Sequence, residues 1–396
     1  MQRRHDIDAL RVIAFGLLIF YHCAMVYVAE WDFHIKSGYQ VEWLQWPMIV
    51  LNRWRMPLLF MISGIAIGLA GVETRRLRFA TSRSWRLLLP LLFGMFVVVM
   101  PQTYFQVIQQ YGYSGGFTHF YKLYLTAGLC RDGQCLPTPT WNHLWYLAYL
   151  WPYTLLLLAL MPALRCVQSW LRTPARADLA GGLLVLVPAA WLAFVQFWLL
   201  PRYPETHALI GDWTVHAESL PLFVLGWVLA SSAWFWAGVE RQRWKTLALA
   251  VSCIALELAL RWLGRHLPDG PLPDWALHVP WYAVERIGRA GYTWFALLAI
   301  FGWGRVLLDR PFCWLPYCTE AVFPWYVLHQ TLIIALAYWL IPLRLGSVAE
   351  PLLVMGGTVA GCLLMHEFVI RRVSLLRPLF GLKMRAPAST SMTIAW

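Results

Sequence analysis

Long apolar runs separated by short polar connections dominate the chain. Each run holds about 20 residues, the length that an α-helix needs to cross the hydrocarbon core of a bilayer. The pattern predicts an all-α, polytopic membrane protein with about ten transmembrane helices. One run, 284–304, differs from the others because Glu285, Arg286 and Arg289 lie at its start. The predicted spans are 8–29, 54–71, 86–104, 141–163, 179–200, 218–238, 244–263, 284–304, 319–341 and 350–370.

Positive charge alternates along the connections between these runs. Every second connection is rich in arginine and lysine, as is the segment after the last run, whereas the intervening connections hold more acidic residues. Since cytoplasmic loops carry the excess of positive charge, both termini are predicted to be cytoplasmic, which fits an even number of spans. The basic connections include Arg75, Arg76, Arg78, Arg83, Arg165, Arg172, Arg176, Arg241, Arg243, Lys245, Arg305 and Arg310, and the others include Glu30, Asp32, Glu42, Glu205, Asp212, Asp269 and Asp274.

Composition supports the same picture. Of 396 residues, 60% are hydrophobic and only 13% are charged, too few charges to cover the surface of a soluble fold. The 25 Trp and 17 Tyr are typical of side chains at the headgroup level of a bilayer. The net charge of +12 follows from the basic loops and does not indicate nucleic acid as a partner. We expect one membrane domain over 1–375 and a cytoplasmic tail over 376–396 that is disordered at its end.

The connection at 105–140 is predicted to form a partly ordered cap on the outer face. It contains Cys130 and Cys135, separated by a short polar segment. A compartment outside the cytoplasm permits a disulfide between them, although two free thiols are also compatible with the sequence. A metal site is not expected, because no pair of histidines accompanies these cysteines.

Ionisable residues inside the predicted spans are candidates for function, because each costs about 2.5–3.5 kcal/mol at the centre of the bilayer. Arg11 and His22 lie in the first span. Eleven residues at about 100° each bring both side chains to one helix face, about 16 Å apart along the axis. A structural interpretation is also open, with Arg11 reaching the cytoplasmic interface and His22 bonded to a neighbouring helix.

Arginines also stand at the entrances of the next two spans. Arg83 and Arg86 are three residues apart, so they share a helix face and offer a pair of guanidinium groups suited to phosphate oxygens. Ordinary cytoplasmic charge is the alternative. Arg55 precedes Ser63 and Gly64, two small residues that favour close packing of helices over a chemical role.

Two aromatic clusters each contain a histidine. Trp141, Trp145 and His143 lie at the start of the fourth predicted span, and Tyr326 and His329 lie in the ninth. Three histidines at middle or outer depth, with His22 the third, predict a polar cavity within the membrane.

Taken together, these motifs resemble membrane acyltransferase family 3, which includes sugar O-acetyltransferases. The resemblance is greatest to the branch with the periplasmic glucan succinyltransferases, glucans biosynthesis protein C, and it covers about residues 8 to 330. The matching motifs are Asp8-Ala-Leu-Arg11 with His22 after ten residues, Arg55-Met-Pro-Leu-Leu-Phe-Met-Ile-Ser63-Gly64, Arg83-Ser-Trp-Arg86 before Leu87-Leu-Leu-Pro90, His143-Leu-Trp-Tyr-Leu147, and Tyr326-Val-Leu-His329.

The resemblance implies that an acyl group passes from cytoplasmic acyl-CoA, a co-substrate rather than a bound cofactor, to a carbohydrate on the far side of a bacterial inner membrane. Arg11, Arg83 and Arg86 would hold the CoA phosphates. His22 is the expected general base, with His143 or His329 orienting the acceptor or polarising the carbonyl. Trp141, Trp145 and Tyr326 are expected to contact the sugar. Arg55, Arg286 or Arg289 would suit a succinyl carboxylate, although each can instead pair with an acid.

A transporter of a polar solute is the alternative from another class, because a translocation path can use the same histidines and arginines. The sequence shows neither the internal repeats nor the paired broken helices found in many transporters. These motifs leave the acyl group, the acceptor and the identity of the base open.

Overall fold

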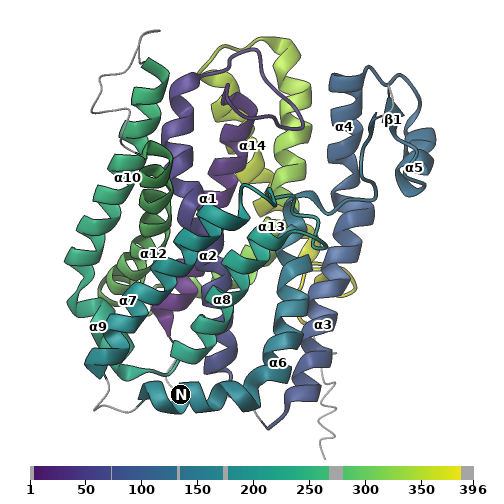
Figure 1. Ribbon diagram of the computed structural model, residues 1–396. Helices are drawn as coiled ribbons and strands as arrows, with labels where there is room; N and C mark the ends of the chain where they lie inside the picture. The colour runs from purple at the N-terminus through teal and green to yellow at the C-terminus, as the bar shows by residue number, and fades with distance from the viewer. Residues whose placement is uncertain (1–3, 73, 132–133, 173–176, 267–279, 385–396) are drawn as a thin grey trace, which may run out of the picture.

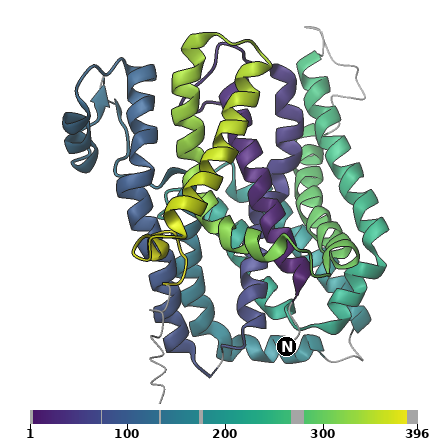
Figure 2. The ribbon, with the colours of Figure 1, turned by 180° about the vertical axis from the view of Figure 1, so that it is seen from behind.

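The computed structural model describes residues 4–72, 74–131, 134–172, 177–266 and 280–384. Long helices run side by side through the molecule (Figures 1 and 2), which confirms the predicted all-α membrane fold. The helices are α1 His5–Tyr27, α2 Gln45–Leu69, α3 Arg76–Phe93, α4 Met100–Tyr111, α5 Phe117–Leu125, α6 Trp145–Arg172, α7 Ala177–Phe194, α8 Trp213–Leu229, α9 Ala233–Arg241, α10 Arg243–His266, α12 Trp281–Leu308, α13 Leu315–Leu340, α14 Ala349–Leu364 and α15 Leu376–Leu379. Short 3₁₀ or π turns are η1 Glu42–Leu44, η2 Gly94–Val98, η3 Asn142–Leu144, η5 Val195–Leu199, η6 Ile341–Leu343 and η7 Met365–Ile370, and the strands are β1 Cys130–Arg131 and β2 Gln134–Cys135.

The number of spans differs from the predicted ten. Within the described residues, eight helical stretches are long and apolar enough to cross a membrane, or nine if α8 and α9, which meet at 109°, count as one broken span. The remaining predicted span, 54–71, falls in α2. That helix has 25 residues, but Asn52, Arg53 and Arg55 occupy its middle and shorten its apolar part.

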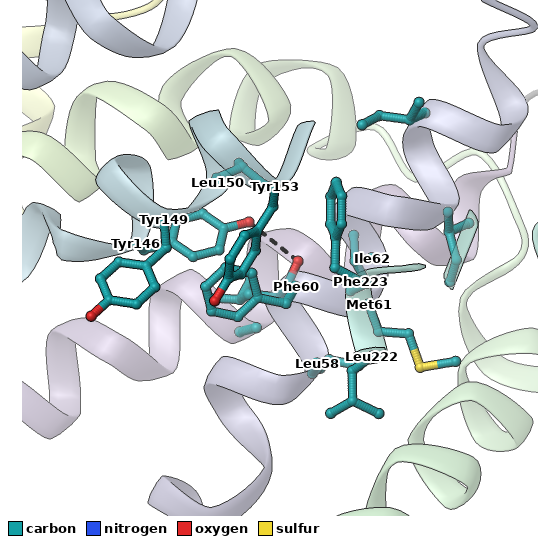
Figure 3. Packing of buried hydrophobic residues seen from close by; sticks show 14 of the residues in the cluster. Leu58, Phe60, Met61, Ile62, Tyr146, Tyr149, Leu150, Tyr153, Leu222 and Phe223 are labelled. Atoms are coloured by element: carbon teal, nitrogen blue, oxygen red, sulfur yellow. Dashed lines mark hydrogen bonds between the residues drawn. The ribbon is translucent and has the colours of Figure 1, made fainter. Parts of the chain in front are cut away.

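Helix α2 is central to the fold because it packs closely against α8 (Figure 3). A Cβ atom at Gly64 would collide with the carbonyl group of Phe223, and one at Gly226 would collide with the carbonyl group of Met61. These glycines therefore let the two backbones approach directly, as the small residue at Gly64 predicted. On its other side Phe60 contacts Tyr146 of α6, with ring centroids 4.8 Å apart. This packing fixes the helix that carries Arg55.

Helices α3 and α4 form one long stretch, Arg76–Tyr111, interrupted only by the π-turn η2. It runs beyond the predicted span 86–104 and extends to a side arm built from α5 and the β1–β2 hairpin (Figure 1). Cys130 and Cys135 form a disulfide in this hairpin, so the disulfide interpretation of these two cysteines is confirmed. The predicted cap at 105–140 is thus a small folded unit with its own apolar cluster, which includes Phe120 and Tyr124.

Two further contacts hold the helices that carry the site. The ammonium group of Lys36 donates to the carbonyl oxygens of Met25, Val28 and Trp31, and so stabilises the carboxyl-terminal end of α1. At the other end of the chain, Phe380 is buried and contacts Phe93 at 5.4 Å between ring centroids. The described part of the predicted tail, 376–384, is therefore attached to the bundle. The predicted disorder from residue 386 onward lies outside the described residues.

Candidate active site

Three histidines from distant parts of the chain meet inside the bundle. His22 comes from α1, His143 from η3 and His329 from α13. The ring of His329 lies 5.1 Å from each of the other two rings, and His22 and His143 are 6.3 Å apart. His329 is fully buried and His143 nearly so, whereas His22 is partly exposed to a cavity. The polar cavity predicted from these residues is present.

Hydrogen bonds fix the tautomers of the neutral cluster. The Nδ1 atom of His329 lies 2.8 Å from the carbonyl oxygen of Tyr326, so this nitrogen carries the hydrogen and donates it. The Nε2 atom of His329 is then an acceptor, and it receives the Nδ1–H of His22 at 2.8 Å. The remaining nitrogen of His22, Nε2, keeps its lone pair. It has no hydrogen-bond partner among the described residues.

His143 is held differently, because both of its ring nitrogens have partners. Its Nε2–H donates to the carbonyl oxygen of Val327 at 3.2 Å, and its Nδ1 lies 3.4 Å from the amide nitrogen of Gln102. Gln102 is fully buried and also donates to Thr331 at 2.7 Å. His143 therefore lacks a free lone pair for a substrate. The geometry makes His22 the one member of the three with a nitrogen available as a base.

A cavity of about 250 Å³ opens beside His22. Arg55 lines it and is 3% exposed, yet its Nε and Nη1 atoms have no hydrogen-bond partner among the described residues. Its guanidinium carbon lies 4.0 Å from the ring centroid of Tyr21. A buried cation without a carboxylate partner is costly, so this side chain is well placed to receive an anionic or strongly polar group. The cavity is lined by Phe15, Leu18, Tyr21, His22, Asn52, Arg53, Arg55, Met56, Pro57, Leu59, His143, Trp145, Glu205, His207, Val215, Glu218, Ser219, Arg289, Thr293 and Tyr326.

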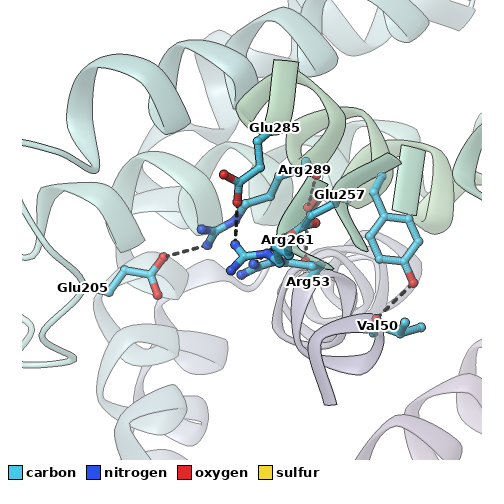
Figure 4. Close-up of polar contacts among 9 residues, drawn as sticks. Val50, Arg53, Glu205, Glu257, Arg261, Glu285 and Arg289 are labelled. Carbon is cyan, nitrogen blue, oxygen red and sulfur yellow. Dashed lines mark hydrogen bonds and ion pairs between the residues drawn. The ribbon is translucent and has the colours of Figure 1, made fainter. Parts of the chain in front are cut away.

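An ionic network contributes Arg53, Glu205 and Arg289 to the lining of this cavity (Figure 4). Arg53 forms an ion pair with Glu257 at 2.6 Å, and Glu257 also pairs with Arg261 at 3.2 Å. Arg289 faces Glu205 at 3.6 Å. Two of the three arginines that suited a succinyl carboxylate thus have partners in the protein. Arg289 has Glu205 beside it in the cavity lining, and Arg286 donates to the carbonyl oxygen of Gln196.

The three arginines predicted to hold CoA phosphates lie near one another. Arg11 and Arg86 are both close enough to Arg83 to interact with it electrostatically. Arg11 pairs with Asp8 at 3.1 Å, and Arg86 donates to the carbonyl oxygen of Gly381 at 3.4 Å. The Nε atom of Arg83 is buried without a hydrogen-bond partner among the described residues. Positive charge from α1 and α3 is therefore concentrated at one place.

Residues 4–367 match the model of an acyltransferase domain, Acyl_transf_3. The match spans nearly the whole chain and includes all three histidines and all three of these arginines. This chain belongs to the acyltransferase 3 family. It is therefore a multi-pass membrane acyltransferase. No curated protein and no solved structure matches it.

The predicted aromatic contacts of this acyltransferase fall into two groups. Trp145 and Tyr326 line the cavity, and Trp145 lies 4.3 Å from the ring of His207. Trp141 is not among the lining residues. Its indole nitrogen instead donates to the carbonyl oxygen of His207 at 2.8 Å, which fixes the connection between α7 and α8. Burial lowers the pKa of His207, so this side chain faces the cavity as a neutral imidazole at pH 7.

Sequence reasoning missed Gln102, Glu205, His207 and Glu218. A lone glutamine in an apolar span was the available signal for Gln102, but a sequence does not show which helix it faces. Glu205 was assigned to an outer connection, and His207, which was not singled out, lies in the same connection. The structure brings this connection, 200–212, to the same cavity as His22.

Proposed function

We propose that this acyltransferase moves an acyl group from cytoplasmic acyl-CoA to a hydroxyl group of a carbohydrate at or beyond the outer face of a bacterial inner membrane. The observation that carries the proposal is the free Nε2 lone pair of His22, which is held at the cavity by the hydrogen bond from its Nδ1 to His329. An imidazole with one nitrogen fixed and the other open to the cavity is suited to general-base catalysis.

In the proposed reaction, Nε2 of His22 removes the proton from the sugar hydroxyl as its oxygen attacks the thioester carbonyl. The carbon–sulfur bond then breaks, and the thiolate of CoA receives the proton from the imidazolium. The products are the sugar ester and free CoA. His329 acts as a positioning residue, because its Nε2 accepts the Nδ1–H of His22 in both protonation states of that ring.

Arg11, Arg83 and Arg86 are proposed to bind the phosphate groups of CoA by charge-assisted hydrogen bonds. Tyr146 links this region to the histidines. It interacts electrostatically with Arg83, and its ring contacts that of Tyr326 at 6.3 Å. The pantetheine arm would pass along α1, which carries both Arg11 and His22.

The acyl group is proposed to be succinyl rather than acetyl. Arg55 supports this choice, because its buried guanidinium lines the cavity with Nε and Nη1 free of partners among the described residues, and a succinyl carboxylate would neutralise it. The motif resemblance to the glucan succinyltransferase branch points the same way. Replacement of Arg55 by methionine should weaken binding of succinyl-CoA and leave that of acetyl-CoA unchanged. Equal weakening of both would assign Arg55 to the thioester carbonyl instead.

The donor is tested with purified protein in detergent, whose thermal stability is measured against acetyl-, succinyl- and longer acyl-CoAs. A ligand at about 100 times its dissociation constant stabilises a protein by about 2.7 kcal/mol. We expect a shift with succinyl-CoA that the double variant Arg83→Ala/Arg86→Ala abolishes. Arg78→Ala, which removes an exposed charge near the start of α3, is the matched control and should keep the shift. If no acyl-CoA stabilises folded protein, the acyl-CoA-dependent mechanism is wrong.

A further inference from the structure

Two chemically different groups of residues line the cavity beside His22, and we call them its histidine end and its ionic end. His22 and Arg55 interact electrostatically at one end. Glu218 lies at the other, where its charged neighbours are Glu205, Arg289 and Arg53. The first end offers N–H donors and a base, whereas the second offers carboxylate oxygens. One cavity therefore offers hydrogen-bond donors and a base to one part of its ligands and hydrogen-bond acceptors to another part.

Glu218 differs from the other acids of this region. Glu257 accepts hydrogen bonds from two arginines, and Glu205 has Arg289 at 3.6 Å. Glu218 lines the cavity, but within the described part of the chain it accepts no hydrogen bond and forms no ion pair within 4 Å. The oxygens of a carboxyl group accept hydrogen bonds, so hydroxyl groups of a ligand are suitable partners for Glu218. Buried Arg55 in the same cavity also has two nitrogens, Nε and Nη1, without a partner among the described residues, so the cavity holds a second group with unused hydrogen-bonding capacity.

We propose that Glu218, with Glu205 and Arg289, forms the acceptor subsite and binds adjacent hydroxyl groups of an uncharged sugar. The two carboxylates would accept hydrogen bonds from these hydroxyls, and Arg289 would donate to a sugar oxygen. Carboxylates repel the phosphates of CoA, a succinyl carboxylate and a uronic acid alike, so this end of the cavity selects against them. The inference rests on the proposed function in taking a carbohydrate as acceptor, and it adds that this carbohydrate is neutral where it meets α8.

Three elements build this subsite. Glu218 comes from α8, Arg289 from α12 and Glu205 from the connection between α7 and α8. Trp145 of α6 lines the same cavity and offers an aromatic surface for a sugar ring. The role of the two carboxylates is to bind and orient the acceptor.

The test measures sugar binding without any acyl-CoA. Thermal stability and calorimetric titration are recorded with neutral tetrasaccharides, cellotetraose, laminaritetraose and maltotetraose, and with an oligosaccharide that contains glucuronate. We expect the wild type to bind at least one neutral sugar and to bind the glucuronate-containing one more weakly. Glu218→Ala should raise the dissociation constant of that sugar about tenfold or more, since hydrogen bonds to charged groups are the stronger ones. Glu218→Gln, which keeps an acceptor oxygen, should have a smaller effect.

Glu285→Gln is the matched control. Glu285 pairs with Arg261 at 2.7 Å and is not one of the residues that line the cavity, so its neutralisation should leave sugar binding unchanged. Loss of acyl-CoA binding in Glu218→Ala with sugar binding intact would overturn the subsite and assign Glu218 to the donor. The subsite would also be overturned if no neutral tetrasaccharide bound the folded wild type. If sugar binding depends on Glu218 while no acyl-CoA binds, the subsite stands and the proposed donor fails.

Discussion

The two ends of the cavity differ in how completely the protein satisfies its own polar groups. At the histidine end, backbone carbonyl oxygens, Gln102 and the hydrogen bond between His22 and His329 engage every ring nitrogen except Nε2 of His22. At the ionic end, Arg53 and Arg261 both donate to Oε1 of Glu257, whose Oε2 has no partner among the described residues. Glu218 lines the cavity and has neither a hydrogen bond nor an ion pair in the described part of the chain. The free group of the histidine end is therefore a single atom, Nε2 of His22, whereas that of the ionic end is the whole carboxyl group of Glu218.

This difference separates chemistry from recognition. A base must be held in one orientation and one tautomer, and carbonyl oxygens of α13 provide this because a helix backbone is rigid. A binding group for hydroxyls needs unused hydrogen-bonding capacity. The nearby ion pair between Arg53 and Glu257 joins α2 to α10 and so holds that end in place.

Replacement of His22 by alanine is expected to have the largest effect at the histidine end, because it removes the proposed base. A general base contributes about 10²–10⁴ in rate, so the turnover number should fall by that factor. The stabilisation by acyl-CoA should persist, because the variant removes none of the proposed phosphate contacts. Steady-state kinetics and thermal shift on the same preparation measure both. Unchanged turnover in folded protein would exclude His22 as the base.

His329→Leu tests the orientation of the base and should have a smaller effect on turnover than His22→Ala. Without Nε2 of His329, the Nδ1–H of His22 loses its acceptor and the ring can rotate or change tautomer. Because such a positioning role alters the base itself, the pH dependence of turnover should shift as well. A lower turnover with an unaltered pH profile would indicate that His329 only fills space.

The ionic end is tested through stability. Glu257 is fully buried and holds two arginines, so Glu257→Ala leaves uncompensated buried charges and should destabilise the protein by about 3–5 kcal/mol. Glu285→Ala removes one partly exposed ion pair and should cost about 0–1 kcal/mol. Thermal denaturation of both variants in one detergent gives the comparison. Similar melting temperatures would show that the Glu257 network does not support this end of the cavity.

The smallest expected effect is a pH dependence of stability from the connection between α1 and η1. Burial lowers the pKa of His34, and the hydrogen bond to Gln106 partly opposes this. The unfolded chain, with a pKa of about 6.5, then binds more protons than the folded one as the pH falls, so stability is full above 6.5 and declines below it. His34→Gln should make the decline of the melting temperature less steep. An equally steep decline in the variant would remove His34 from the explanation.

Much of the site could be predicted because its residues are unusual for their surroundings. Histidines inside apolar spans are costly, so hydropathy is enough to single out His22, His143 and His329. Arg55 was named as a partner for a succinyl carboxylate only through the family resemblance. Small residues in a span indicate close helix contact, and Gly64 indeed touches α8. The family match to residues 4–367 agrees with the motifs that suggested it.

The residues that were missed are, by contrast, not unusual for their surroundings in the sequence. Gln102, Glu205 and Glu218 are ordinary polar residues whose importance lies in what they face, and hydropathy gives no information about rotation or depth in the bundle. The connection at 200–212 was predicted to lie outside the membrane, but it lines the cavity with His22. The predicted count of ten spans differs from the structure for a similar reason. Arg53 and Arg55 lie inside α2 and line the cavity, and they shorten the apolar part of that helix.

The sequence by itself determined that the chain is a helical membrane protein with polar groups committed to its interior, because apolar length and the cost of buried charge are local properties. Only the tertiary structure decided which histidine has a free lone pair, which arginine lacks an acid and which glutamate lacks a donor. Each of these depends on partners far away in the chain, as His22 and His329 show across 307 residues. Hydrogen bonding between packed helices distinguishes otherwise identical side chains, and that distinction is absent from any single segment.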